Sequence, residues 1–253
     1  MFSKAIVKTP CRAMTNGITT ADLGIPQFEV ALEQHLDYIQ ALKDCGLEVL
    51  ILDADENYPD STFVEDVALL TPHCAILTNP GASTRRNETL SMLPILKQFY
   101  ASVDLITAPG TVEAGDIMMV ESHYYIGLSQ RTNHQGAEQL ISILEKNNMT
   151  GSIVTLEEVL HLKTGLGYLE GNNLLACGEF LTKPEFQKFN LMSVNEKESY
   201  AANSVWINGT VLVPFGFPKT KYLIEGKGYK VRTVDVSEFQ KLDGGLSCLS
   251  LRF

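Results

Sequence analysis

One pattern recurs along the chain and constrains its fold more than any other feature. A short acidic or glycine-rich stretch, here called a lead-in, is followed by an apolar run, a turn and a second apolar run. The pattern occurs in "FVEDVALLTPHCAILTNPG", "EAGDIMMVESHYYIGLSQR", "GLGYLEGNNLLACGEF" and "AANSVWINGTVLVPFG". Short apolar or β-branched runs separated by turn residues are typical of β-hairpins. The sequence therefore predicts four hairpins.

The two ends of the chain supply the parts of a fifth unit. The C-terminal "DGGLSCLSLRF" contains a lead-in and one strand, and the N-terminal "SKAIVKTP" is a candidate partner strand. Anchor residues of the five lead-ins stand roughly 40 to 50 residues apart, a spacing in the range of propellers and repeat arrays. They are Asp66, Asp116, Gly165, Asn203 and Gly244.

Helical segments separate several of these hairpins. "FEVALEQHLDYIQALKDCG" and "NHQGAEQLISILEKNN" carry apolar residues at helical spacing, and "STRRNETLSMLPILKQFY" is a weaker third. The strands "LEVLILDA" and "GSIVTL" follow the first two, which gives hairpin, helix and strand as the unit. Five such units would form a ring whose axis is lined by the lead-ins. An α+β domain with accidental similarity among its hairpins is the alternative. Without a linker, we expect one domain over residues 1–253.

Composition limits the partners and the compartment. The net charge of -10 argues against nucleic acid, which requires clustered Lys and Arg, and a small cationic substrate fits better. The five cysteines are scattered without a CxxC pair, so neither a disulfide framework nor a structural zinc site is indicated, and the cytoplasm is the expected compartment. No apolar run approaches the roughly 18 residues that span a bilayer, so no membrane partner is expected.

Acidic residues collect at the lead-ins. Glu65 and Asp66 precede one apolar strand, and Glu113 and Asp116 precede another. Carboxylates beside a buried strand cost desolvation unless a cation or a hydrogen-bond donor meets them. Converging carboxylates suit a planar cation with several donors, such as a guanidinium. Bonds from each acid to a nearby backbone N–H are the competing explanation.

Three other residue types admit a functional reading beside a structural one. Cys248 lies five residues from the C-terminus, past a Gly-Gly pair, and is either a core thiol or a nucleophile held on a strand, with the glycines admitting a backbone or ligand. His161 is either a structural or exposed residue, or a group that lowers the pKa of this thiol and gives acid–base help. Arg85 and Arg131 follow strands and are either surface residues or ligands of a carboxylate. No phosphate loop and no HExxH motif is present.

Taken together, these stretches resemble the dimethylarginine dimethylaminohydrolases. The resemblance covers essentially the whole chain, from "IVKTP" through "PDSTFVEDVALL", "NPGASTRR", "APGTVEAGDIMMV", "YIGLSQRTN", "VLHLKTGLGYLEGNNLLACGEF" and "ESYAANSVW" to "DGGLSCLSLRF". It implies the α/β fold of that family, a five-bladed α/β propeller (pentein fold) with pseudo-five-fold repeats. It also implies hydrolysis of methylated arginines to citrulline and methylamines through a covalent thiouronium intermediate.

The resemblance also implies site residues. Cys248 would be the nucleophile, His161 the general acid and base, and Glu113 the carboxylate that supports them. Asp66 would bind the guanidinium with Glu65 beside it, Asp60 the α-amino group, and Arg85 and Arg131 the α-carboxylate. The remaining substrate-binding positions are Ile18, Phe63 and Leu242; Ile18 stands where family members are expected to have Leu. We expect no cofactor and no required metal, and a homodimer from family habit.

Two other functions remain open at this point. One is a deiminase of arginine or agmatine that uses the same thiol chemistry, although the chain has no room for the helical insertion usual in arginine deiminases. The other is a propeller that binds methylarginines without catalysis. The joint presence of Cys248, His161 and Glu113 speaks against it.

Overall fold

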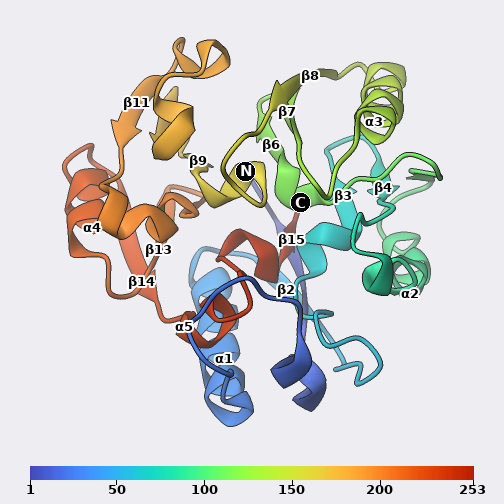
Figure 1. The fold of residues 1–253 in the computed structure, drawn as a ribbon, viewed down its shortest axis with the longest axis horizontal. Helices are drawn as coiled ribbons and strands as arrows, with labels where there is room; N and C mark the ends of the chain where they lie inside the picture. Colours follow the sequence, from blue (N-terminus) through green and yellow to red (C-terminus); the bar gives the residue numbers. More distant parts are fainter. The chain divides into compact units, whose positions relative to one another are not determined.

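Five three-stranded sheets make up the computed structural model, which describes all 253 residues (Figure 1). In every sheet the middle strand is antiparallel to one neighbour and parallel to the other, the third strand; the antiparallel neighbour precedes it in the chain in four sheets and is the last strand of the chain in the fifth. A helical connection joins the middle strand to the third. This order is the predicted unit of hairpin, helix and strand, and its fivefold repetition confirms the α/β repeat fold.

The chain divides into two compact units. The first unit contains Met1–Val64 and Gly165–Phe253, and the second contains Glu65–Thr164. The sheets of the first unit are β15 (Leu251–Arg252), β1 (Lys4–Lys8) and β2 (Glu48–Leu52); β9 (Leu166–Tyr168), β10 (Asn173–Ala176) and β11 (Asn190–Ser193); and β12 (Val205–Ile207), β13 (Thr210–Pro214) and β14 (Lys230–Val234). Those of the second unit are β3 (Ala68–Leu70), β4 (Ala75–Leu77) and β5 (Val103–Leu105); and β6 (Ile117–Val120), β7 (His123–Leu128) and β8 (Thr150–Thr155).

Four of the five crossover connections contain an α-helix. These are α1 (Phe28–Asp44), α2 (Glu88–Leu96), α3 (His134–Lys146) and α4 (Pro218–Glu225), whereas the connection from β10 to β11 contains the 3-10 helices Gly178–Leu181 and Pro184–Phe186. A fifth α-helix, α5 (Ser237–Gln240), follows β14. The other 3-10 helices are Arg12–Asn16, Val64–Val67, Ser83–Arg85, Ala114–Asp116, Leu162–Thr164, Glu196–Ala202 and Ser247–Leu249.

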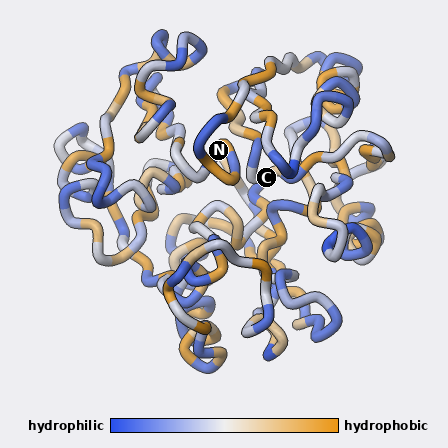
Figure 2. Tube along the Cα trace, in the orientation of Figure 1, coloured by the Kyte–Doolittle hydropathy of each residue, from blue (hydrophilic) through white to orange (hydrophobic).

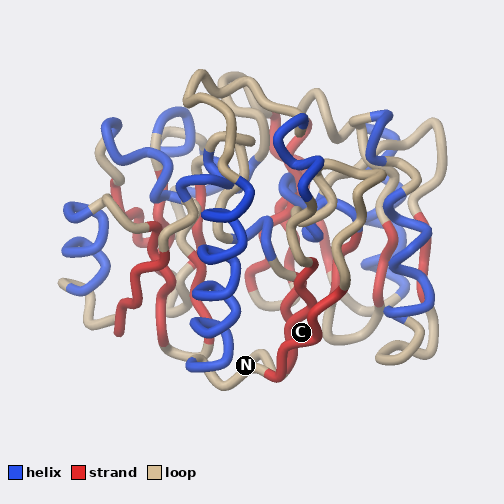
Figure 3. Tube along the Cα trace, turned by 90° about the horizontal axis from the view of Figure 1, so that it is seen from below, coloured by secondary structure: helices blue, strands red, loops and turns tan.

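The predicted fifth unit across the termini is confirmed. Strand β1 pairs antiparallel with β15, with Ala5 opposite Arg252 and Ile6 opposite Leu251, so the two ends of the chain lie side by side (Figure 3). The expectation that Cys248 stands in a strand was wrong. It lies in the 3-10 helix Ser247–Leu249, because the Asn203 side chain accepts the Ser247 N–H and holds the chain in a turn before β15 begins.

Local sequence explains the ends of the two long helices. Helix α1 ends before Gly46, whose φ of +88° is a left-handed conformation that favours glycine. Helix α3 begins after Asn133, whose side chain accepts the Gly136 N–H. Helix α1 carries both hydrophilic and hydrophobic residues (Figure 2), and its buried residues recur at helical spacing, as expected of a helix with one buried face.

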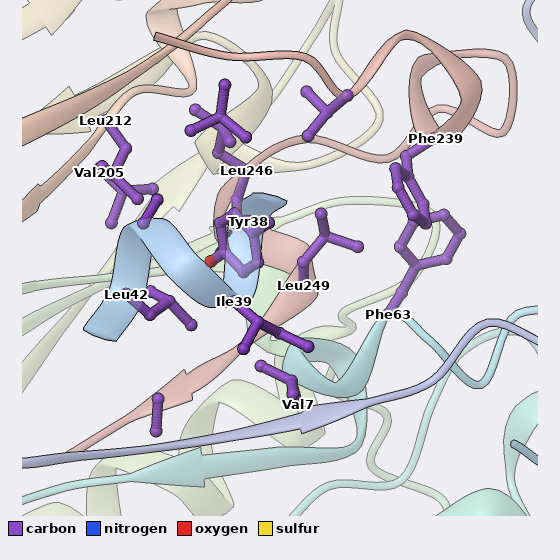
Figure 4. Packing of buried hydrophobic residues seen from close by; sticks show 14 of the residues in the cluster. Val7, Tyr38, Ile39, Leu42, Phe63, Val205, Leu212, Phe239, Leu246 and Leu249 are labelled. Atoms are coloured by element: carbon purple, nitrogen blue, oxygen red, sulfur yellow. Dashed lines mark hydrogen bonds between the residues drawn. The ribbon is translucent and has the colours of Figure 1, made fainter. Parts of the chain in front are cut away.

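Each unit has its own apolar core. In the first unit, Tyr38, Ile39 and Leu42 on one face of α1 pack into a cluster with residues of β1, β12 and β13 and of the C-terminal segment (Figure 4). In the second unit, Leu140 and Leu144 of α3 belong to a cluster with residues of β6 and β7. No helix has the length and apolar character needed to cross a membrane. The single domain expected over 1–253 stays a prediction.

Candidate active site

The lead-in acids of the second unit are buried directly in front of two strands. Asp66 lies in the 3-10 helix that precedes β3, and Asp116 ends the 3-10 helix that precedes β6. Glu113 is the residue just before that second helix. Asp66, Glu113 and Asp116 are 5%, 1% and 0% exposed, so their carboxylates are withdrawn from water and must be met by donors or cations within the protein.

Glu113 is paired with the predicted catalytic histidine. His161 Nε2 lies 2.9 Å from Glu113 Oε2, and the Ala82 N–H donates to Glu113 Oε1 at 2.9 Å. Burial raises the pKa of Glu113, but the hydrogen bond and charge of His161 outweigh it and lower that pKa to about 2. Glu113 is therefore ionised and faces a histidine ring nitrogen that donates to it.

His161 is held in its protonated form by surrounding acids. Burial lowers its pKa, but the charge of Asp116, the hydrogen bond to Glu113 and the charge of Asp66 raise it to about 9. Asp116 also fixes the backbone beside this ring, because its Oδ1 accepts the Leu162 N–H at 3.0 Å. At neutral pH the His161 ring can therefore give a proton, as a general acid must.

Asp66 completes a compact group with this pair. Ligand atoms of Asp66, Glu113 and His161 all lie within 4.8 Å of one another. The Gly115 N–H donates to Asp66 Oδ1 at 3.2 Å, and a Cβ at Gly115 would stand 2.9 Å from His161 Nδ1, so only glycine fits there. Two oxygens and one nitrogen at this spacing could hold a metal ion, which would have to displace the proton from His161.

The predicted arginines and Glu65 lie in the same unit, and the surface reading of Arg85 was wrong. Arg85 is 4% exposed, and its Nη1 donates to Asp66 Oδ2 at 2.6 Å. Arg131 is half-buried, with Nη1 3.5 Å from Glu113 Oε1. Glu65 forms an ion pair with Lys163 at 2.5 Å. The second unit therefore contains carboxylates and guanidinium groups in one connected network.

In the first unit, three of the predicted residues surround Gly17. Asp60 Oδ1 accepts the Ile18 N–H at 3.0 Å. A Cβ at Gly17 would stand 2.8 Å from Asp60 Oδ1 and 3.2 Å from Leu242 Cδ1. The absence of a side chain at Gly17 thus lets Ile18, Asp60 and Leu242 come together, while the Ile18 side chain remains 36% exposed.

Cys248 is half-buried and is positioned by neutral groups of the first unit. The Gly245 N–H donates to Cys248 Sγ at 3.3 Å, which suits a sulfur that carries negative charge. Side chains of the same unit, rather than a second backbone segment, occupy the space beside Gly244 and Gly245. A Cβ at Gly244 would stand 2.2 Å from the Phe63 ring, and one at Gly245 would stand 2.5 Å from Asn203 Oδ1.

Sequence reasoning missed three residues of the network in the second unit. Glu88 binds Arg85, Gly115 binds Asp66, and Lys163 binds Glu65. The spacing of Arg85 and Glu88 is the i,i+3 spacing of helical ion pairs, which is a signal that the sequence does contain. No local pattern links Lys163 to Glu65, because that contact depends on how the chain folds back.

Comparison with known proteins shows which family this chain resembles. Residues 25–197 match the family described as "N,N dimethylarginine dimethylhydrolase, eukaryotic". The N(G),N(G)-dimethylarginine dimethylaminohydrolase of Pseudomonas aeruginosa is 55% identical over 254 residues and is covered completely, as is this chain. The enzyme of the same name from Streptomyces coelicolor is 32% identical over 98% of this chain and 96% of its own length.

Solved structures agree with these relatives. A structure of the Pseudomonas aeruginosa enzyme, a cysteine-to-serine variant complexed with citrulline, has a TM-score of 0.99 at 55% identity over 100% of both chains. A dimethylarginine dimethylaminohydrolase adduct with S-methyl-L-thiocitrulline has the same values. The N-terminal domain of a cyanobacterial arginine dihydrolase has a TM-score of 0.89 at 19% identity over 100% of this chain and 97% of that one, which shows the shared fold alone.

Proposed function

This chain belongs to the dimethylarginine dimethylaminohydrolase family, and we propose that it hydrolyses N-omega-methylated arginines to citrulline and dimethylamine or methylamine. The observation that carries the proposal is the 55% identity to such an enzyme over the complete length of both chains. Complexes with citrulline and with S-methyl-L-thiocitrulline, described for its relatives, support the same substrate class. The substrate is a small cation, which agrees with the acidic network of the second unit.

The first half of the reaction needs a nucleophile and an acid. In our proposal the Cys248 thiolate attacks the guanidinium carbon, and the carbon–nitrogen bond to the methylated amine breaks. An amine is a poor leaving group unless it takes a proton, and His161 gives that proton. The His161 pKa of about 9 keeps the ring protonated at neutral pH, so the acid is ready before substrate arrives.

The second half of the reaction needs a base. Having lost its proton, His161 can accept one from a water molecule that attacks the thiouronium carbon. The carbon–sulfur bond then breaks and the Cys248 thiolate is restored. Citrulline leaves after losing the proton of its new hydroxyl group, which the released amine takes up in solution. Glu113 stabilises the imidazolium on either side of this exchange, since its Oε2 faces His161 Nε2 at 2.9 Å. Atoms and charge balance with water as the only co-reactant.

We assign the remaining polar residues to binding. Asp66 pairs with the guanidinium and Glu65 lies beside it, while Asp60 takes the α-amino group. Arg85 and Arg131 take the α-carboxylate, a role for which the planar guanidinium fork is suited. Ile18 and Leu242 contribute backbone carbonyls, and Phe63 an apolar contact. A cytoplasmic location and a homodimer are parts of the same proposal.

Product analysis tests this function. The purified, EDTA-treated protein is incubated with asymmetric dimethylarginine, and citrulline and dimethylamine are measured beside a Cys248→Ser variant. We expect equal amounts of both products from the wild type and none from the variant. Ammonia from arginine or agmatine instead would identify a deiminase. Binding of methylarginine without turnover in the wild type would identify a non-catalytic binding protein.

A further inference from the structure

Glu88 is a buried carboxylate that the mechanism above leaves without a role. It is the first residue of α2, and its side chain is 4% exposed. Both of its oxygens face Arg85: Nε donates to Oε1 at 3.1 Å, and Nη2 donates to Oε2 at 2.9 Å. This side-on geometry fixes the plane of the Arg85 guanidinium as well as its position.

The orientation of Arg85 in turn fixes the position of the Asp66 carboxylate. Its Nη1 donates to Asp66 Oδ2 at 2.6 Å, while the Gly115 N–H donates to Asp66 Oδ1. The Asp66 carboxylate is thus held at both oxygens, and one of the two donors is itself held by Glu88. Burial lowers the pKa of Arg85, but Asp66 and Glu88 outweigh it and raise that pKa, so the guanidinium between them keeps its charge.

The charge balance of these three residues depends on Glu88. Two carboxylates share one guanidinium, which leaves the set with one negative charge. Without Glu88, Arg85 and Asp66 would form a neutral pair, and the attraction of Asp66 for a cation would be cancelled. Because the Arg85 and Asp66 side chains are 5% and 7% exposed, water screens this effect little.

We propose that Glu88 is a positioning residue that keeps Asp66 oriented and its negative charge available to the cationic guanidinium of the substrate. The inference rests on the proposed function and deepens it. The substrate carries a guanidinium, whereas the product citrulline carries a neutral ureido group. Glu88 should therefore favour substrate over product through charge, although it touches neither.

A purely structural role for Glu88 predicts a different result. If Glu88 only anchored the start of α2, its loss would loosen the site and weaken the binding of substrate and product alike. The ratio of the two dissociation constants separates these roles. Both ligands have the same α-amino and α-carboxylate groups, so changes in how those ends are bound cancel in the ratio.

The test compares Glu88→Gln with matched variants in a Cys248→Ser background, where asymmetric dimethylarginine binds without turnover. Calorimetry gives the dissociation constants of asymmetric dimethylarginine and of citrulline. We expect the preference for the cation over citrulline to fall by about tenfold, the lower end of what an opposite charge a few ångströms away contributes. Glu179→Gln is the matched control. The Glu179 side chain is 9% exposed and its carboxylate is paired with Lys183 four residues along the chain, so its removal should leave the preference for the cation unchanged.

A double variant keeps the test decisive if Glu88→Gln fails to fold. Arg85→Gln leaves Asp66 and Glu88 with two negative charges, and adding Glu88→Gln leaves one, so the preference for the cation should be lower in the double variant than in Arg85→Gln. Equal weakening of both ligands by Glu88→Gln, or an unchanged ratio, would overturn the inference. Failure of the proposed function would appear separately, as a wild type that does not turn over asymmetric dimethylarginine.

Discussion

Replacing Glu113 by Gln should lower the pKa of His161. The amide is the same size and its oxygen can still accept from Nε2, so the substitution removes the charge and keeps the 2.9 Å hydrogen bond. An opposite charge at this range moves a pKa by about one to three units. Asp116 and Asp66 remain and still favour the imidazolium, so we expect the lower part of that range.

The expected fall is about one to two pH units from the native value of about 9, which corresponds to about 1.4 to 2.7 kcal/mol. Proton NMR of the histidine Cε1–H signals measures the titration, and the signal that disappears in His161→Gln identifies His161 among the five histidines. Glu138→Gln, which removes an exposed carboxylate from the same unit, is the matched control and should leave the midpoint in place. A His161 midpoint within about 0.3 of the native value in Glu113→Gln would refute the ion-pair reasoning.

Two further predictions concern stability. The His161 pKa is raised from 6.5 to about 9 in the folded state, so the associated stabilisation should be complete below pH 6.5 and lost as pH rises through 9; it amounts to roughly 3 kcal/mol at most. Urea unfolding between pH 6 and pH 10 should show this loss in the wild type and a flatter profile in His161→Gln, and parallel profiles would contradict it. Gly244→Ala should cost about 1–3 kcal/mol, because its Cβ would stand 2.2 Å from the Phe63 ring. Gly226→Ala, whose nearest neighbour would stand at 3.2 Å, should cost less, and equal unfolding free energies would show that the ring moves aside at no cost.

The repeat could be predicted because its signals are local. Alternating apolar runs and turn residues mark the hairpins, and the end-to-end pairing of β1 with β15 followed from counting lead-ins. The third strands β2 and β8 were predicted as well, whereas β14 was not, and neither were β5 and β11. The sequences of these two strands, "VDL" and "NLMS", are too short and too polar to be distinguished from loops.

The site could be predicted in its residue types but not in its contacts. The resemblance pointed to Glu113 and His161, yet their hydrogen bond spans 48 residues, and nothing in the sequence specifies which acid meets the ring. The surface alternative for Arg85 stayed open in the sequence because its partner Asp66 lies 19 residues away. The turn at Cys248 was misread as a strand because a tertiary contact from Asn203 overrides the local apolar pattern.

The two units differ in how they position their functional groups. Substitutions in one unit should therefore have different effects from substitutions in the other. The second unit buries ionised groups, including Glu113, Arg85 and His161, where apolar residues of similar size would often be as stable or more so. Because burying these ionised groups costs desolvation free energy, the network is better explained by a role in binding and converting a cation than by a contribution to the stability of the fold. In the first unit, amide groups and glycines that leave no room for a side chain position Cys248. Changes in the second unit should therefore move the pKa of His161 and the preference for a cation. A change such as Gly245→Ala should impair the nucleophile while the His161 titration stays as it is.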